Sequence, residues 1–409
     1  MGERFDSDVF IAGGGPAGLA AAIAARQTGL TVIVADSARP PIDKACGEGI
    51  VPEGVAALRQ LGVTLPLQPA DRLRTASFSP GQFSALAGMR FIDSNGAITA
   101  RFPRGSGCGV RRTVLHQMLV ERAEEVGVEL RWGSHVSLPP NWRNDGTGRG
   151  AWGVVVDGGA VRCRWLIAAD GQNSSLRAQA GLDGWRGARR RFGFRYHYGV
   201  APWSEFVEVH WGERSQLYVT PVGGDEICVA LLTAEPHLSS APTRAATARA
   251  GDRIFDEALA HFPAVAERLG GARRLSRLRG GLTVTRTLPL VWRENLALIG
   301  EASGSVDAIS GEGLTMAFQQ ALALAAALQA GDLRLYQAAH RRISRLPHFM
   351  TWLMLNMDRH GGFRRRVLRA FSTEPGLFAH LLAIHVGAMS PWCFGVRGTV
   401  SLGWHLLTA

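Results

Sequence analysis

The sequence predicts an α/β protein in which a parallel sheet is interrupted by an inserted mixed or antiparallel sheet and followed by a helical C-terminal region. Three observations predict this fold: a strand, turn, helix and strand over residues 8–36, β-type runs over residues 74–104 and 192–232, and helical patterning from residue 336 onward. With 409 residues, 46% of them hydrophobic, the chain can bury a core of that size.

The first βαβ unit is the clearest local pattern. Residues 8–13 are rich in strand formers, and Pro16–Gln27 is alanine-rich with a proline in its first turn, which suits the start of a helix. Gly29 ends this helix, and residues 31–35 form a second apolar run. A βαβ unit of this kind predicts a parallel sheet.

Further elements along the chain continue the same domain after interruptions. The predicted elements are a helix over residues 112–126, strands over 129–132, 162–168 and 296–300, and a buried helix over 314–329. The expected organisation is a discontinuous cofactor domain (1–73, 106–185, 291–335), a β-sheet substrate domain (74–105, 186–290) and a helical C-terminal region (336–409).

The chain is strongly basic, with a formal net charge of +11, and all but one of its 45 basic residues are arginines, the exception being Lys44. The sequence lacks the motifs that would use this charge to recognise nucleic acid, namely helix-turn-helix, zinc-finger and aromatic-plus-basic RNA motifs. We therefore expect no nucleic-acid partner. An anionic cofactor, an acidic substrate or a membrane surface accounts for the charge equally well.

The five cysteines, Cys46, Cys108, Cys163, Cys228 and Cys393, are far apart and show no CxxC spacing. An odd, dispersed set indicates a reducing compartment and argues against a disulfide framework or a structural zinc site. The N-terminus lacks the basic and then apolar pattern of a signal peptide. We expect a cytoplasmic protein without a bound metal.

A glycine-rich turn joins the first strand to the first helix. Its residues are Gly13, Gly14, Gly15, Pro16, Ala17 and Gly18. In the pattern GxGxxG, Gly13 permits the tight turn, Gly15 lets the backbone approach a pyrophosphate, and Gly18 lets helix and strand pack closely. The phosphates would lie at the helix N-terminus, and Asp36 at the end of the next strand would bind the ribose hydroxyls. The alternative is a turn with a structural role alone.

Two later segments resemble fingerprints of one FAD-dependent family. Residues 165–177 (WLIAADGQNSSLR) resemble its stretch GADGxxSxxR, with alanine at the first glycine, and residues 298–314 resemble its stretch GDAAG…GxG. The family includes p-hydroxybenzoate-hydroxylase-like monooxygenases, geranylgeranyl reductases and flavin-dependent halogenases. The resemblance covers residues 8 to 330 and implies an FAD/NAD(P)-binding Rossmann-like fold of the glutathione-reductase type, with FAD as the cofactor.

The resemblance also implies which residues bind FAD. They are Gly13, Gly15, Pro16, Ala17, Gly18, Asp36, Lys44, Cys46, Gly47, Arg112, Val136, Asp170, Gly171, Gly300, Glu301, Gly311, Gly313 and Leu314. Glu301 stands where the family usually has aspartate, at a strand end where a carboxylate can accept a hydrogen bond from a ribityl hydroxyl. Gly311 and Gly313 would leave bare N–H groups at a helix start near the flavin ring.

The loop over residues 43–50 (DKACGEGI) resembles the CGxG loop of the reductase and halogenase branches, rather than the arginine-bearing loop of phenol hydroxylases. Its glycines would allow the backbone to press against the flavin ring. The candidate catalytic residues are Cys46, Tyr218 and His197, and further polar candidates on the β-type runs are Arg195, Tyr196 and Thr220. Inert buried cysteine and ordinary sheet-face residues are the alternatives.

Branch-specific runs separate the possible reactions. The halogenase run WxWxIP is missing, and residues 216–224 (QLYVTPVGG) keep the tyrosine, proline and glycines of the reductase run YxWxFP without its two aromatic residues. The resemblance then implies an FAD-dependent monooxygenase (hydroxylase) that uses NAD(P)H and oxidises a hydrophobic, aromatic or polyketide-like molecule. The alternatives are an FAD-dependent reductase of isoprenoid or lipid double bonds and a flavin-binding electron carrier or assembly factor.

The C-terminal region ends in an apolar stretch, since residues 375–396 contain no Asp, Glu, Lys or Arg. The stretch is long enough to cross a bilayer, but His380, His385 and Pro391 oppose that interpretation. We favour helices packed on the cofactor domain. The alternative is an interfacial anchor or lid with peripheral membrane contact, because a basic helix precedes the apolar one.

Overall fold

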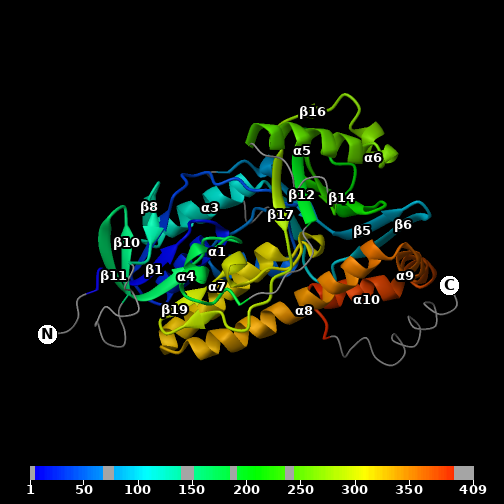
Figure 1. Ribbon diagram of the computed structural model, residues 1–409. Helices are drawn as coiled ribbons and strands as arrows, with labels where there is room; N and C mark the ends of the chain where they lie inside the picture. Colours follow the sequence, from blue (N-terminus) through cyan, green and yellow to red (C-terminus); the bar gives the residue numbers. More distant parts are fainter. Residues whose placement is uncertain (1–4, 68–77, 140–151, 185–190, 235–243, 391–409) are drawn as a thin grey trace.

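The computed structural model describes residues 5–67, 78–139, 152–184, 191–234 and 244–390. Figure 1 shows two sheet-containing regions side by side, with three long helices, α8 to α10, along one side of the molecule. The expected α/β fold, with an inserted mixed sheet and a helical C-terminal region, is confirmed.

The first sheet has the strand order β18-β19-β11-β1-β2-β8, and the four neighbouring pairs from β19 to β8 are parallel. Its strands are β1 (Ser7–Ala12), β2 (Val32–Asp36), β8 (Glu129–Trp132), β11 (Gly159–Ala168), β18 (Trp292–Arg293) and β19 (Leu296–Leu298), with β9 (Val136–Ser137) and β10 (Trp152–Val156) paired to its side. Helices α1 (Pro16–Gln27), α3 (Arg112–Glu125) and α7 (Gly313–Ala330) pack together beside it. The parallel order brings strand ends from distant parts of the chain to one edge.

The second sheet has the order β16-β12-β15-β14-β13-β5-β6 and is antiparallel except for the β13–β5 pair. Its strands are β5 (Gly88–Asp93), β6 (Gly96–Arg101), β12 (Arg191–Gly199), β13 (Phe206–Trp211), β14 (Ser215–Gly223), β15 (Glu226–Thr233), β16 (Arg273–Arg274) and β17 (Arg279–Thr283). Side chains alternate between its faces: Tyr218 and Ala230 join one core with Phe378, while Tyr196 packs on the other face against Phe255.

A small third sheet joins the two larger ones. It consists of β3 (Gly49–Ile50), β7 (Gly107–Val110) and β4 (Phe83–Leu86), with α2 (Pro52–Gln60) following directly after β3. Gly109 lies so close to β14 that an added Cβ would come within 1.7 Å of the Pro221 carbonyl oxygen. This close packing fixes the loop before β3 between the two larger sheets.

The C-terminal region contains α8 (Leu333–Arg359), α9 (Gly361–Thr373) and α10 (Pro375–His385). Helix α8 packs on α7, as the favoured interpretation expects, whereas α10 packs on β6 of the second sheet. Among the described residues no helix is both long and apolar enough to cross a bilayer. The rest of the apolar stretch, residues 391–396, lies outside the described residues.

The structure adds two helices that the sequence did not predict and shortens one predicted strand. Helices α5 (Arg244–Leu259) and α6 (Pro263–Arg268) follow β15, and Phe255 and Val265 from them cover one face of the second sheet. The strand expected to reach residue 300 ends at Leu298, because Gly300 has a φ of 60° and begins a short 3-10 helix, η4 (Gly300–Ser303).

Candidate active site

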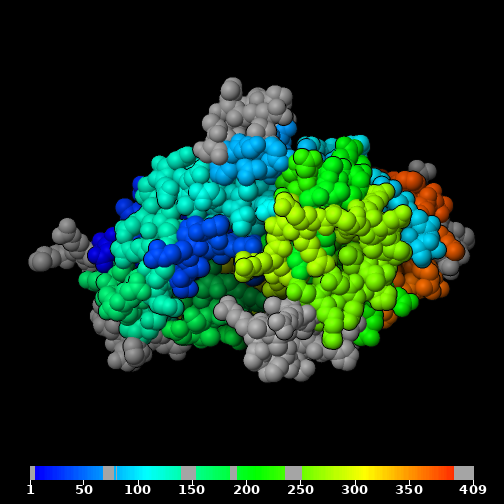
Figure 2. All heavy atoms as spheres, turned by 90° about the horizontal axis from the view of Figure 1, so that it is seen from above, coloured from blue at the N-terminus to red at the C-terminus, as the bar shows by residue number. Residues whose placement is uncertain are grey.

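A cavity of about 870 Å³ lies between the first and second sheets. Figure 2 views the molecule from above and shows a hollow between the blue N-terminal segment and the yellow-green segment of the second sheet. Residues Ile42 and Lys44 from the first segment and Gly281 and Leu282 from the second are in its lining. The size is that of a small-molecule or cofactor site.

The glycine turn forms one wall of this cavity in the way the sequence predicts. An added Cβ at Gly13 (φ 115°) would lie 2.3 Å from the Ala169 carbonyl oxygen, and one at Gly18 would lie 1.8 Å from the Gly13 carbonyl oxygen. A Cβ at Gly15 would meet nothing within 4 Å, so this position is open toward the cavity. The turn therefore leaves free backbone at the start of α1, as a pyrophosphate requires.

The predicted FAD-binding residues gather around this one cavity. All line it except Gly18, which packs behind the turn. Three polar atoms of its lining residues are buried without a partner among the described residues, Arg112 Nε, Asp170 Oδ1 and Arg195 Nε. Buried polar atoms of this kind require a hydrogen-bonding ligand, so the cavity fits a long polar cofactor such as FAD.

Asp36 and Glu301 lie at the two strand ends that the sequence identifies. Asp36 Oδ2 accepts a hydrogen bond from the Gly14 N–H at 2.7 Å, which orients the carboxylate beside the turn. Glu301 pairs with Lys44 across the cavity, and both side chains are about half exposed. An added Cβ at Gly313, the first residue of α7, would meet nothing within 4 Å, so that helix start is also open.

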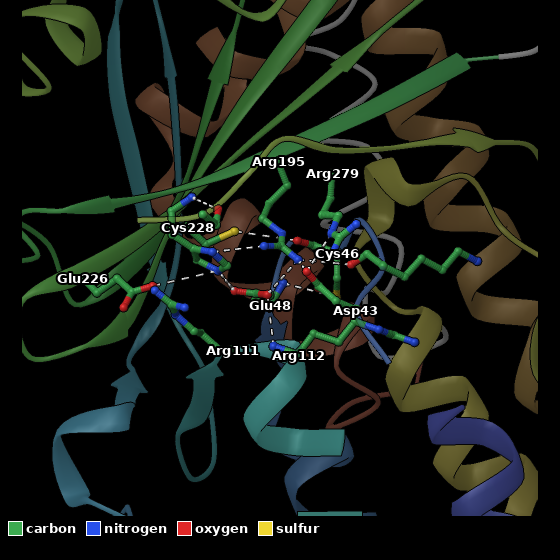
Figure 3. A network of polar contacts seen from close by, with 12 residues as sticks. Asp43, Cys46, Glu48, Arg111, Arg112, Arg195, Glu226, Cys228 and Arg279 are labelled. Atoms are coloured by element: carbon green, nitrogen blue, oxygen red, sulfur yellow. Dashed lines mark hydrogen bonds and ion pairs between the residues drawn. The ribbon is translucent and has the colours of Figure 1, made fainter. Parts of the chain in front are cut away.

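A buried polar network surrounds Glu48, at the base of the same cavity (Figure 3). Glu48 is 2% exposed, has a φ of 60° and lies between Gly47 and Gly49. Its Oε1 accepts a hydrogen bond from the Arg112 N–H at 3.0 Å. A non-glycine residue in this backbone region is uncommon and persists where its surroundings fix it, so the loop holds this carboxylate in place.

His197 contacts Glu48 and Arg195 through its two ring nitrogens. Nε2 lies 2.5 Å from Glu48 Oε2, and Nδ1 lies 3.0 Å from Arg195 Nη1. A guanidinium has only donors, so Nδ1 must accept and Nε2 carries the proton that is donated to Glu48. The arrangement assigns a neutral imidazole with its proton directed at a buried carboxylate.

Arg195 links this pair to the loop. Its Nη2 lies 2.6 Å from Asp43 Oδ1 and 3.5 Å from Glu48 Oε1. Burial alone would raise the pKa of Asp43, but the hydrogen bond from Arg279 and the charge of Arg195 outweigh it and lower that pKa. Two carboxylates therefore face Arg195, which balances the buried charge.

The candidate catalytic residues from the sequence have different positions. Cys46 and Tyr218 line the cavity, and His197 contacts Glu48, which lines it. Burial raises the pKa of the Cys46 thiol, with the charge of Arg112 opposing the shift, so the thiol is a weak nucleophile. The Tyr218 hydroxyl donates to the Ile309 carbonyl oxygen at 2.7 Å and so fixes the 3-10 turn η5 (Ala308–Ser310).

The other polar candidates lie on opposite faces of the second sheet. The backbone pairs His197 with Cys228 and Cys228 with Thr220, so these three residues form a row on the cavity face. Tyr196 points to the opposite face, where its hydroxyl bonds Asp252. Tyr196 is therefore not part of the cavity, because neighbouring residues of a strand point to opposite sides.

The ligand atoms of Glu48, His197 and Cys228 lie within 4.8 Å of one another, a spacing that could also hold a cation. The chemistry around them opposes it. Arg195 already places a positive charge against both Glu48 and His197, and burial raises the pKa of Cys228 well above its usual range. A protonated thiol is not a metal ligand, so the cluster is better suited to hold a proton.

One part of the cavity is apolar and lies against the second sheet. Its residues are Leu86, Met89, Phe102, Val207, Ala230 and Leu232. Gly49 connects this part to the loop, since an added Cβ there would contact Val207, Thr220 and Leu86 at 3.5 to 3.7 Å. Glu48, the residue before Gly49, lines the same cavity.

The sequence analysis missed Glu48 and Asp43 as functional candidates. The available signal was local: Glu48 is a charged residue flanked by two glycines in a loop already expected to face the flavin. Its partner His197 is 149 residues away, so their contact depends on the register of β12 in the second sheet. That register is not readable from the sequence alone.

Comparison with known proteins gives a family for this site. A protein-family model described as an FAD binding domain matches residues 6–334. A solved flavoprotein/dehydrogenase from Cytophaga hutchinsonii has a TM-score of 0.76 at 17% identity, covering 97% of this chain and 98% of that one. A halogenase solved in complex with FAD has a TM-score of 0.69 at 17% identity, covering 98% and 85%. These matches confirm the resemblance, the fold and FAD as the cofactor.

Curated relatives include both reductases and a monooxygenase. A menaquinone reductase of Mycolicibacterium smegmatis is 28% identical over 360 residues, 81% of this chain and 79% of that protein. A digeranylgeranylglycerophospholipid reductase of Methanopyrus kandleri is 26% identical over 317 residues, covering 75% and 73%. A tetracenomycin B2 monooxygenase-dioxygenase of Streptomyces olivaceus is 28% identical over 206 residues, covering 44% and 37%.

Proposed function

This chain belongs to the FAD-binding family of flavoprotein oxidoreductases, and we propose that it is a reductase that saturates a carbon–carbon double bond in an apolar, isoprenoid-type molecule. The two reductase relatives match about three quarters or more of the chain, whereas the monooxygenase relative matches less than half. Oxygenation, the reaction that the sequence favours, remains the competing prediction.

The observation that carries the proposal is the Glu48–His197 pair beside the apolar wall. Saturating a double bond requires a proton as well as a hydride, and an apolar pocket by itself supplies no proton. Glu48 lines the cavity, and its Oε2 lies 2.5 Å from the protonated Nε2 of His197. A Glu48 carboxyl that is held by the Nε2–H of His197 can carry a proton of its own at the place where an apolar substrate would meet the flavin.

Replacement of the used proton also has a candidate route. Glu226 Oε1 lies 4.0 Å from His197 Nε2, and its side chain is 19% exposed beside Arg111. Glu226 thus lies between bulk water and the buried pair. We assign Glu48 as the group that faces the substrate and regains its proton from solvent on the Glu226 side, and His197 as the positioning residue that orients the Glu48 carboxyl through its Nε2–H.

The proposed reaction is balanced by these groups and the cofactor. The π electrons of the double bond form a C–H bond to the proton held by Glu48, and the carbon left electron-deficient takes a hydride. When bound in its reduced form, FAD supplies that hydride. NAD(P)H is the expected donor of the two electrons, and solvent returns the proton to the pair.

An anaerobic half-reaction tests the proposal. FAD-loaded protein is reduced with dithionite and mixed, under nitrogen, with a menaquinone that carries an unsaturated side chain or with a geranylgeranyl lipid. We expect the absorbance of oxidised flavin to return and mass spectrometry to find a product with two added hydrogens. Oxygen consumption that depends on substrate, with an oxygenated product and no anaerobic turnover, would show an oxygenase instead.

A matched pair of variants isolates the role of Glu48. Glu48→Gln keeps the shape of the side chain but lowers the rate of anaerobic flavin reoxidation by ~10²-fold or more, because general acids contribute effects of that order. Glu208→Gln is the control, since Glu208 is equally buried beside a histidine but lies outside the cavity. Equal rates for the two variants would remove Glu48 from the reaction.

A further inference from the structure

One exposed stripe of α8 combines apolar and basic side chains. It consists of Leu335, Ala338, Arg342, Arg345, Phe349 and Trp352, all exposed. Their spacing alternates between three and four residues, which places them on one face of the helix. The stripe extends over about 26 Å, at 1.5 Å of rise per residue. Figure 1 shows α8 along the outer side of the molecule.

The apolar members of the stripe are unusually exposed. The exposed fractions are 53% for Leu335, 50% for Phe349 and 59% for Trp352. The rings of Phe349 and Trp352 stack on each other with centroids 6.0 Å apart. Large aromatic side chains are rarely left in water in this way, so the face fits contact with an apolar environment.

Most charges along α8 and α9 are positive, and the acids Asp332 and Glu374 flank the two helices. From residue 333 to residue 373 the sequence has nine arginines and one acid, Asp358. The Asp358 side chain is 7% exposed and pairs with the buried Arg191 at 3.4 Å, so it does not neutralise the surface. A face that offers both aromatic rings and arginines for which the described part of the chain shows no acidic partner complements an anionic surface with an apolar interior.

We propose that this stripe of α8 docks the protein on the surface of an anionic lipid bilayer. Phe349 and Trp352 would enter the region between headgroups and acyl chains, and Arg342 and Arg345 would contact the anionic headgroups. The inference does not depend on which reaction the cavity performs. It does explain how a protein without a membrane-crossing helix among its described residues could reach an apolar substrate held in a membrane.

A second copy of this chain is a less suitable occupant of the same face. Arg342 and Arg345 lie at the middle of the stripe. In a two-fold symmetric dimer formed through this face, the middle of the stripe meets itself. Four arginines would then face each other without an acid nearby, and like charges at an interface oppose association.

Vesicle flotation of the FAD-loaded full chain tests the proposal. We expect the protein to float with vesicles of phosphatidylcholine plus phosphatidylglycerol and to stay behind with vesicles of phosphatidylcholine alone. Both Arg342→Gln/Arg345→Gln and Phe349→Ser/Trp352→Ser weaken binding by about tenfold or more, since each charge near an anionic surface and each buried apolar side chain contributes on the order of a kcal/mol. Added salt weakens binding of the wild-type protein.

Matched variants elsewhere control for charge and hydrophobicity. Leu290→Ser removes another exposed apolar side chain, and Arg59→Gln/Arg253→Gln removes two other exposed arginines. Both controls keep wild-type flotation, and all variants keep the FAD content of the wild type. Three results would each overturn the proposal. The first two are equal flotation of stripe and control variants and absence of wild-type binding. The third is a wild-type dimer, detected by light scattering, that the Phe349→Ser/Trp352→Ser variant abolishes.

Discussion

Two buried glutamate–histidine pairs lie on opposite faces of the second sheet, and they differ in what surrounds them. Glu48 and His197 lie on the face that meets the cavity, with Nε2 and Oε2 2.5 Å apart. Glu208 and His210 lie on the face covered by α6, with the corresponding atoms 3.1 Å apart and the His210 ring against Phe262. The same chemical pair thus lies beside the cavity in one case and beside a hydrophobic core in the other.

The difference between the pairs shows how a fold makes one pair functional. Glu208 is held by Trp203 and Arg90 in addition to His210, and it is not among the residues that line this cavity. Glu48 has a partner on the sheet and a backbone donor on α3, and it is among the residues that line the cavity. Contact with the cavity, rather than the pairing itself, is what distinguishes the proposed proton donor from the other pair.

We expect the largest difference in kcat between the two pairs when each histidine is replaced. His197→Gln removes the Nε2–H that orients the Glu48 carboxyl, and we expect it to lower kcat by ~10- to 10²-fold with little change in KM. His210→Gln leaves kcat within about twofold, because His210 borders no substrate space. Steady-state kinetics as a function of pH measure both, and equal loss in the two variants would mean that the faces are not functionally different.

The next effect concerns the tautomer of His197, which the contact with Arg195 fixes. The structure shows no arginine contact of this kind for His210 among the described residues. Arg195→Met removes the donor to Nδ1, so His197 can take a second proton. We expect the pH profile of kcat to differ from that of the wild type, because the proton on His197 is no longer confined to Nε2. Arg195→Lys, which keeps a charged donor, is the comparison, and an unchanged profile in Arg195→Met would argue against tautomer control.

The Glu208–His210 pair should contribute to the free energy of unfolding rather than to kcat. Burial alone would raise the pKa of Glu208, but hydrogen bonds from His210 and Trp203 and the charges of His210 and Arg90 outweigh it and lower that pKa. A lowered folded-state pKa stabilises the protein above the unfolded value near 4.5 and loses that contribution as the pH falls below it. Glu208→Gln is expected to cost ~1–3 kcal/mol at pH 7, with a smaller difference from wild type below pH 4 in urea unfolding.

A third buried carboxyl, Glu312, lies 3.8 Å from His385 Nδ1, and burial lowers the pKa of that histidine to about 4, so the ring is neutral. The described residues offer Glu312 no arginine or lysine partner, so its effect on stability should change with pH in the opposite direction. Burial raises its pKa to about 8, and its Oε2 has no partner among the described residues. The wild-type protein therefore loses stability as the pH rises from 4.5 to 8, since the unfolded chain releases the proton first. Glu312→Gln is expected to be more stable than wild type by ~1 kcal/mol or more at pH 8. Thermal unfolding at pH 5 and pH 8 measures the change, and a smaller gain at pH 8 than at pH 5 would contradict it.

Local chemistry determined the cofactor domain, and for this reason the sequence could predict it. The helix α1 has the expected bounds, Pro16–Gln27, because a proline at its first turn and a glycine shortly after its end act within a few residues. The close approaches of Gly13 and Gly18 also arise within one strand–turn–helix unit. Asp36 and Glu301 could be placed because strand ends of a parallel sheet meet at one edge.

The tertiary structure alone decided the chemistry of the candidate site. Glu48 and His197 meet because a loop after β2 reaches the face of a sheet formed more than a hundred residues later, in the register that pairs His197 with Cys228. The same register turned Tyr196 away from the cavity, and the packing of η5 engaged the Tyr218 hydroxyl. A sequence records which side chains alternate along a strand, but a shift of one residue reverses every face, and long-range packing fixes that shift.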